Sequence, residues 1–471
     1  MKKIVAFIFL TSVFFINFLP VKDTDFGWHY RCGNEFLTKG ILCTTNRFSY
    51  FLSNYQAFNP SFLYDIGLAV VYNLGGFIAV SFFGALLLTL CAYLFLKLTR
   101  GGALWIKALF FYISLFLSQV VFNLGLRSQI VSYSFVLMTL LLLEKKQVFG
   151  LRTLFIIPFL FAVWVNTHIG FFTGVIIFMF YALGEIPNII RTKNIKYAIF
   201  LLLTVLLSFL ATGINPFGFK VYKEILNHAA SPMNKMIAEW VEPTLSHMIL
   251  LIVSYISMIS ISIIKKKLTL FEFLTLTLFF VLSIQARRNL PFFYTYLSIL
   301  TINKANLEKA NFLEKDVLIP IFVTVTLFFV LLQLPKTIKE GTSWNAYCYN
   351  NFSNYPCKTL LKFPDLDGNI FANYEWGGFL IWKKPKSKVF IDGRMPAWKD
   401  VNGENSYPIF LKVLQTQKGW NEKLIGLKTD YILISPNTFL DAKLRSNPEA
   451  YGWRIIHREE YAVLYKKADR L

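Results

Sequence analysis

The sequence has few charged residues, which form only 16% of its 471 positions, against about 25% in ordinary soluble proteins. Its five histidines show no metal-ligand spacing, and neither a phosphate-binding glycine-rich loop nor a Gly-x-Ser-x-Gly motif occurs. These absences argue against ATP-driven transport and against that class of hydrolase. With only five cysteines, the chain is not a disulfide scaffold either.

What is present in excess is apolar. Hydrophobic residues make up 55% of the chain, and phenylalanine alone occurs 49 times, which suggests a lipid-facing surface. The net charge of +21 would indicate nucleic acid as the partner of a soluble protein. Here most cations in the first 335 residues lie in short breaks between apolar runs, a pattern typical of membrane topology. We therefore expect the lipid bilayer as a partner and no nucleic acid.

The apolar runs predict a polytopic α-helical membrane protein with about eleven transmembrane helices, since a span needs about 20 apolar residues. The first run follows Lys2 and Lys3 as in a signal peptide, but no small-residue cleavage site follows it, so an uncleaved span is favoured. The weakest of the runs is 290–302. The expected spans are 4–20, 76–98, 103–122, 129–143, 153–167, 170–185, 197–213, 246–264, 269–285, 290–302 and 316–334.

The cations also predict an orientation. Residues 1–335 contain 27 Lys and Arg, and 17 of them fall on the cytoplasmic side if the N-terminus is cytoplasmic, as the positive-inside rule expects. An odd number of spans then places 336–471 outside. We expect a multi-pass protein of the inner or plasma membrane, with a transmembrane domain at 1–335, a first outer loop at 21–60 and an extracytoplasmic domain at 336–471.

Four of the five cysteines form two close pairs, both on the expected outer side. Cys32 and Cys43 lie in the first outer loop, and Cys348 and Cys357 follow the last span. Pairs in an oxidising compartment favour two local disulfides. Four free thiols, or one of the other two connectivities, are the alternatives.

The composition changes after Pro335, where turns rich in glycine and proline separate short segments. Strands alternating with helices predict a small α/β domain of about 135 residues. The expected helices are 404–417 and 419–427. The expected strands are Asn369–Ala372, Lys388–Ile391, Tyr431–Ser435, Trp453–His457 and Tyr461–Tyr465.

Candidate functional residues are polar groups at the ends of spans. Asp23 and Asp25 directly follow the first span, and two carboxylates at this spacing can bind a divalent cation such as Mg²⁺ or Mn²⁺, or one can act as a general base. His29 follows in the same segment as a further candidate for substrate binding. The alternative is a solvated loop that begins a helix.

Arginines form the second group. Arg127 lies between two apolar runs, and Arg287 and Arg288 lie between two others, all on the expected outer side. Guanidinium groups in such positions suit a phosphate, which they bind in a fork. The alternative for each is snorkelling toward lipid headgroups.

Two outer loops add further candidates. Asn166 and His168 lie in a hairpin between two spans, where they line a pocket or simply satisfy the hairpin by hydrogen bonds. In the loop 214–245, Glu239 is a candidate second acid and Trp240 a candidate stacking face for a sugar, although tryptophan is common at membrane interfaces.

These features together resemble the C-type glycosyltransferase (GT-C) superfamily, in particular a little-studied bacterial and archaeal branch. The resemblance rests on an acidic Asp-x-Asp loop after the first span, many spans, an outer C-terminal domain, and short strings in order along the chain. Where that branch often has Arg-Pro-Gln, this chain has Arg-Ser-Gln. The strings are Asp23–His29, Arg127–Gln129, Trp164–Gly170, Asn215–Gly218, Arg287–Asn289, Glu375–Gly378 and Ile391–Arg394.

The resemblance implies transfer of a sugar from a polyprenyl-phosphate carrier to a glycan or protein acceptor at the outer membrane face. It implies that Asp23 or Asp25 is the catalytic carboxylate, and it leaves metal dependence open. With Arg288 assisted by Arg287 or Arg127 at the leaving phosphate, a single displacement predicts inversion.

Two other readings remain. A lipid-linked glycan polymerase, ligase or flippase also needs many spans and outer arginines, and it would lack a transfer step that depends on Asp25. A small-solute transporter is the third, but the sequence shows no internal repeat of the kind that such folds often contain.

Overall fold

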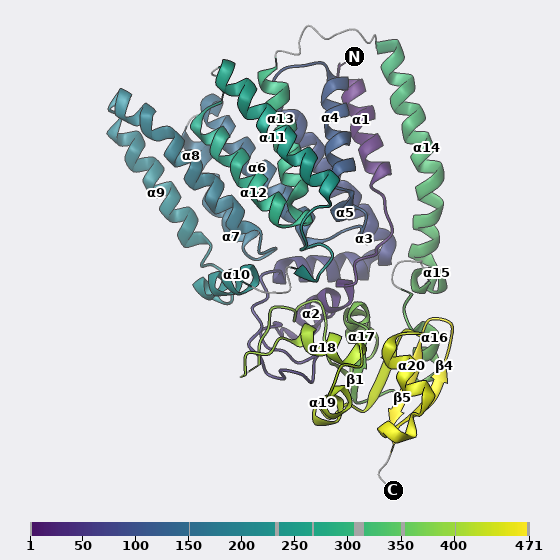
Figure 1. Cartoon of the computed structure of the whole chain (residues 1–471). Helices are drawn as coiled ribbons and strands as arrows, with labels where there is room; N and C mark the ends of the chain where they lie inside the picture. The colour runs from purple at the N-terminus through teal and green to yellow at the C-terminus, as the bar shows by residue number, and fades with distance from the viewer. Residues whose placement is uncertain are drawn as a thin grey trace. The chain divides into compact units, whose positions relative to one another are not determined.

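The computed structural model describes residues 2–149, 151–230, 235–265, 268–305, 315–349, 354–400 and 402–468. It divides into two compact units, each built from segments distant in sequence (Figure 1). The helical unit comprises Met1–Pro20, Ala79–Ile225 and Asn234–Thr337, and the sheet unit comprises Val21–Ile78, Leu226–Met233 and Ile338–Leu471. The first outer loop therefore belongs with the C-terminal segment.

The helical unit contains a helix in each of the eleven ranges that the apolar runs predict. Among the described residues, three helices are long and apolar enough to cross a membrane, namely α3, α8 and α11, so the number eleven is not confirmed. The helices of this unit, three of which extend past its boundaries, are α1 (Lys2–Ile16), α3 (Phe62–Leu98), α4 (Leu104–Leu117), α5 (Gln119–Phe122), α6 (Ser128–Phe149), η1 (Leu151–Phe155), α7 (Ile156–Trp164), α8 (Phe171–Thr192), α9 (Ile195–Ala211), η2 (Gly218–Lys220), α10 (Val221–Ala229), α11 (Leu245–Lys265), α12 (Leu270–Gln285), η4 (Arg287–Asn289), α13 (Leu290–Lys304) and α14 (Lys315–Thr342).

Large apolar side chains fill the centre of the helical unit. Phe9, Phe111, Phe161 and Trp164 are completely buried there, while many leucines and isoleucines on the outside of α9 and α11 remain exposed. A helix that is apolar on every face fits a lipid environment, where the outer face needs no polar residues.

The sheet unit is built on one five-stranded sheet of order β2-β1-β3-β5-β4. Strands β2, β1 and β3 are parallel, while β5 is antiparallel to both β3 and β4. The strands are β1 (Asn369–Ala372), β2 (Lys388–Val389), β3 (Tyr431–Ile434), β4 (Trp453–Arg458) and β5 (Val463–Lys467). All five predicted strands and both predicted helices are confirmed, with ends that shift by a few residues.

Helices and a buried core complete the sheet unit. Phe371, Ile432 and Trp453 from the sheet pack with Phe51 of the first outer loop and Phe410 of a covering helix. Its helices are α2 (Phe26–Lys39), α15 (Trp344–Cys348), α16 (Cys357–Lys362), η6 (Tyr374–Trp376), α17 (Gly377–Lys383), α18 (Ser406–Leu414), α19 (Trp420–Gly426), α20 (Phe439–Ser446) and η7 (Glu449–Tyr451).

Both disulfides of the structure lie in the sheet unit and join local pairs. Cys32 on α2 is bonded to Cys43, and Cys348 on α15 is bonded to Cys357 on α16. Each closes a short loop, which restricts the unfolded chain and so stabilises the fold. Cys91 is buried with a free thiol.

Candidate active site

The acidic segment occupies the turn that begins α2. Asp25 is the residue before the first helical position, and its backbone N–H donates to the Oδ1 atom of Asp23 over 3.3 Å. Asp23 is only 5% exposed, whereas Asp25 is partly exposed. A base must reach its substrate, so of the two carboxylates Asp25 is the better placed to accept a proton.

Glycines bring three strings of the sequence together around Asp25. A methyl group on Gly393 would overlap the carboxylate of Asp25, and one on Gly378 would overlap the backbone of Thr24. Gly27 of α2 similarly faces the backbone of Gly378 in α17. The glycines are therefore required because backbone and carboxylate approach too closely for any Cβ.

Next to this contact lies a buried ion pair. The Nε and Nη2 atoms of Arg394 donate to the two carboxylate oxygens of Asp392, each over 2.7 Å. The same guanidinium stacks on the rings of Phe48 and Trp398, at 4.9 and 5.5 Å from their centroids. The fork and the rings fix the arginine in one orientation.

Tyr374 lies close to the carboxylates of Asp25 and Asp392. Burial, together with the nearby carboxylates of Asp25 and Asp392, raises the pKa of Tyr374 well above its usual value. The phenol therefore stays neutral in the physiological range. Tyr374 lies in η6, directly before the string Glu375–Gly378, and its ring packs edge-on against Tyr407.

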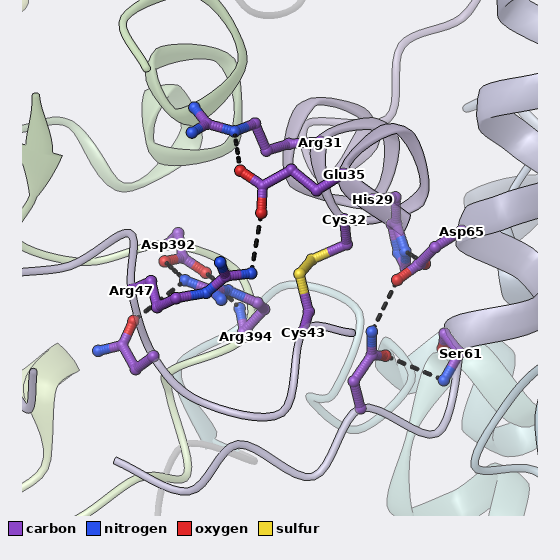
Figure 2. The surroundings of a disulfide bond; sticks show 12 residues. His29, Arg31, Cys32, Glu35, Cys43, Arg47, Ser61, Asp65, Asp392 and Arg394 are labelled. Carbon is purple, nitrogen blue, oxygen red and sulfur yellow. Dashed lines mark hydrogen bonds and ion pairs between the residues drawn. A yellow bond between two sulfur atoms is a disulfide. The ribbon is translucent and has the colours of Figure 1, made fainter. Parts of the chain in front are cut away.

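His29 forms a second buried group one turn into α2 (Figure 2). Its Nδ1 atom is hydrogen-bonded to Oδ1 of Asp65, and Nδ2 of Asn59 donates to Oδ2 of the same carboxylate over 2.7 Å. The imidazole also stacks on Trp28. Asp65 thus fixes the ring orientation of His29, as a carboxylate does for many functional histidines.

The predicted arginines lie in the helical unit and converge on one carboxylate. Arg127 forms an ion pair with Glu239, with Nη1 as the donor, and both side chains are largely buried. Gln129, at the start of α6, lies 3.5 Å from the second oxygen of Glu239. Glu239, expected as a second acid, is here the partner of Arg127.

Arg288 completes this group, which we call the arginine cluster (Arg127, Glu239, Trp240 and Arg288). Its guanidinium lies 5.0 Å from the ring centroid of Trp240, and its backbone N–H donates to the carbonyl of Glu239. Burial lowers the pKa of Arg288, Glu239 raises it and Arg127 lowers it. An arginine remains charged under all these influences, so the cluster keeps a net charge of one positive unit.

Arg287 points to a different set of partners. Its backbone N–H donates to the carbonyl of Val241 over 3.1 Å, and its Nε donates to the carbonyl of Glu242 over 3.0 Å. These bonds attach η4 to the segment that carries Glu239 and Trp240. Arg287 therefore helps to hold the cluster in place through its backbone and its side chain.

The other two predicted residues, in the hairpin between α7 and α8, are hydrogen-bonded to groups on α6, on α7 and after α9. His168 Nδ1 is bonded to the hydroxyl of Ser132, which also accepts from the indole of Trp164. Nδ2 of Asn166 donates to the carbonyls of Ala162 and Ile214, each over 2.7 Å. Its Oδ1 atom is buried with no partner among the described residues.

The predicted site residues thus fall into two groups. Asp23, Asp25 and His29 lie in the sheet unit, whereas Arg127, Asn166, His168, Glu239, Trp240, Arg287 and Arg288 lie in the helical unit. Asp65, the partner of His29, was not predicted as a site residue, because it lies just beyond the expected outer loop at 21–60. The position of the Asp65 carboxylate shortly before an apolar run is the sequence feature that could have indicated it.

The two carboxylates predicted as possible metal ligands, Asp23 and Asp25, do not fit a metal centre of the usual kind. In the part of the chain that the structure describes, no three carboxylate, histidine or cysteine side chains gather closely enough to hold an ion. Asp23 is also used to accept the backbone N–H of Asp25. Mg²⁺ and Mn²⁺ prefer several oxygen ligands, which these two carboxylates do not supply.

No protein-family model matches the sequence, and no curated protein sequence matches it. Solved structures do. The archaeal oligosaccharyltransferase AglB from Archaeoglobus fulgidus, in complex with an inhibitory peptide and a dolichol-phosphate, gives a TM-score of 0.55 at 12% identity. That match covers 92% of this chain and 69% of the other.

Two further structures of an oligosaccharyltransferase from the same organism agree. One, tethered with an acceptor peptide containing the NVT sequon, gives a TM-score of 0.53 at 12% identity over 92% of this chain and 69% of the other. The second, a complex with Zn and sulfate, gives 0.50 at 10% identity over 98% and 73%. The chain therefore shares its fold with this archaeal oligosaccharyltransferase.

Proposed function

We propose that this chain is an integral-membrane glycosyltransferase that transfers a sugar from a polyprenyl-phosphate carrier to an acceptor at the outer membrane face. The observation that carries the proposal is the arginine cluster, a largely buried cationic group in a fold shared with enzymes of lipid-linked glycosyl transfer. One of those enzymes was solved with a dolichol-phosphate. Three described helices are long and apolar enough to cross a membrane, so a carrier in the bilayer would approach the helical unit from the lipid.

In this proposal the arginine cluster receives the phosphate leaving group. Negative charge grows on the phosphate as the bond to the anomeric carbon breaks. Arg288 supplies the uncompensated positive charge, because Glu239 already balances Arg127. A fixed cation in a site of low dielectric stabilises such a charge far better than water does. Trp240, under the guanidinium, keeps it from turning away.

Asp25 is the general base of the proposed reaction. Its carboxylate takes the proton from the acceptor as the acceptor attacks the anomeric carbon, and the carrier phosphate leaves from the opposite side. One displacement without a covalent intermediate inverts the configuration at that carbon. The support for Asp25 over Asp23 is its greater exposure and its contact with Gly393.

The membrane arrangement belongs to the same proposal. The N-terminus is cytoplasmic, about eleven helices cross the membrane, and the sheet unit is extracytoplasmic. Two disulfides in that unit support an oxidising location for it. The acceptor is a glycan or a protein; a structural neighbour with a tethered acceptor peptide makes a peptide the first to test.

The experiment uses the purified full-length protein in lipid nanodiscs with a polyprenyl-phosphate-linked sugar and a peptide or glycan acceptor. Sugar transfer is followed by mass spectrometry for the natural chain, Asp25→Asn and Arg288→Ala. We expect both variants to lose transfer. Full activity in both would overturn the proposal, and carrier movement across the membrane that tolerates Asp25→Asn would indicate a flippase instead.

A further inference from the structure

The sheet unit contains a small basic pocket to which the proposed reaction assigns no role. It lies where the first outer loop meets α17 and β2, and its volume is about 120 Å³. This is about four times the volume that one water molecule occupies in the liquid, enough for a carboxylate or a phosphate. Its charged and aromatic lining consists of Arg31, Glu35, Arg47, Phe48, Lys386 and Lys388.

Two arginines of this pocket are held in place by one carboxylate. The Nε atom of Arg31 donates to one oxygen of Glu35, and Nη2 of Arg47 donates to the other, each over 2.8 Å. Nη1 of Arg31 also donates to the carbonyl of Ile381. Both guanidinium groups stack near the ring of Phe48, at 5.1 and 5.8 Å from its centroid. The pocket is therefore preorganised.

The disulfide between Cys32 and Cys43 lies next to this arrangement (Figure 2). Cys32 follows Arg31 directly, and Cys43 lies four residues before Arg47, so the bond joins the two segments that carry the arginines. Because both segments are tied covalently, the arginines lose little freedom when they bind a ligand.

The charges of the pocket do not balance. Four cations face one carboxylate, which leaves three positive charges. Lys386 and Lys388 are exposed, and neither forms an ion pair with another residue that the structure describes. Two fixed arginines with two adaptable lysines form a typical site for an anionic oxygen group.

The pocket is connected to Asp25 by contacts inside the sheet unit. The ring of Phe48 that carries Arg31 and Arg47 also carries Arg394, and the neighbouring Gly393 touches the carboxylate of Asp25. We propose that this pocket binds a carboxylate or phosphate group of the acceptor, so that the enzyme selects anionic acceptors. The inference rests on the proposed function, because it assigns that reaction's acceptor.

The binding test uses full-length protein in phosphatidylcholine nanodiscs, with inorganic phosphate as the probe. Phenylglyoxal modifies accessible arginines, and mass spectrometry follows its rate at Arg31, Arg47 and the exposed Arg454 of the same unit. When the phosphate concentration is twice its dissociation constant, modification of Arg31 and Arg47 should slow about threefold, since only the unoccupied fraction reacts. Chloride at equal ionic strength should not.

Two variants sharpen the result. The double variant Lys386→Gln with Lys388→Gln should lose the protection, and Lys418→Gln, at an exposed lysine elsewhere in the unit, should keep it. Equal slowing at Arg454, or no slowing, would overturn the proposal. Protection by phosphatidylglycerol nanodiscs without phosphate would overturn it too, because the occupant would then be a lipid headgroup.

Transfer kinetics test the link to the acceptor. The double lysine variant should raise the KM for an acidic acceptor several-fold with kcat unchanged, and should leave the KM for a neutral acceptor as it was. An unchanged KM for the acidic acceptor would overturn the assignment. Because phosphate protection is measured without turnover, a chain that binds phosphate but transfers no sugar would contradict only the proposed function.

Discussion

The two groups of candidate residues are built in opposite ways. In the sheet unit, Asp25 is partly exposed and lies against Gly393. Elsewhere in this unit, Asp65 is bonded to His29 and Asn59, and Asp392 is paired with Arg394. In the helical unit, Arg127 is buried and paired with Glu239, whereas Arg288 is partly buried and its charge is not balanced within the cluster. One unit therefore offers an accessible carboxylate, and the other offers a cluster with one net positive charge.

The largest effect on the transfer rate is expected from a change at the carboxylates of the sheet unit. Asp25→Asn should lower kcat by about 10²–10⁴-fold, because an amide cannot accept the acceptor's proton. Steady-state transfer assays measure it. Asp23→Asn is the matched control: its amide oxygen still accepts the backbone N–H of residue 25, so a smaller loss is expected. A greater loss in Asp23→Asn would reverse the assignment.

The next largest effect on the transfer rate is expected from a change in the arginine cluster of the helical unit. Arg288→Ala should cost about 10²–10³-fold in kcat, through loss of charge at the leaving phosphate. Arg288→Lys keeps the charge but not the planar fork, and should recover part of that rate. Equal activity of the alanine and lysine variants would show that charge at this position is not used.

The contact between glycine and carboxylate gives a smaller, purely geometric effect. Gly393→Ala places a methyl group where the Asp25 carboxylate lies, and a misplacement of about 1 Å can cost about 10²-fold in rate. Gly426→Ala in α19 has open space around its Cβ and serves as the control. Transfer assays should show a loss of rate in Gly393→Ala but not in Gly426→Ala. Thermal unfolding should show that both variants fold normally.

The smallest effect concerns stability rather than rate. Cys32→Ser with Cys43→Ser should lower the free energy of unfolding by about 2–3 kcal/mol, as expected for a short disulfide loop. The pair Cys348→Ser with Cys357→Ser should cost a similar amount. Only the first should also speed phenylglyoxal modification of Arg31 and Arg47; equal acceleration in both variants would contradict the role of that bond in the pocket.

Local patterns allowed much of this molecule to be predicted. Short β-rich runs predicted all five strands of the sheet, and the close spacing of Cys32 and Cys43 favoured the local bond that the structure contains. The resemblance to the GT-C superfamily is confirmed at the level of the fold. Such features depend on neighbours in sequence, which a linear analysis can see.

Partners distant in sequence were not predictable. Nothing local joins Glu239 to Arg127, Asp65 to His29, or Gly393 to Asp25. The same holds for the basic pocket, whose arginines and lysines come from positions more than 300 residues apart.

Hydrophobic periodicity and turn residues act over a few positions, so the amino-acid sequence is enough to identify the apolar helices, the strands and the charged segments. The union of the first outer loop with the C-terminal sheet, and the charges that meet there, become visible only in the folded chain. The reason is physical: a buried charge is stable only beside a partner, and packing of the whole unit selects that partner.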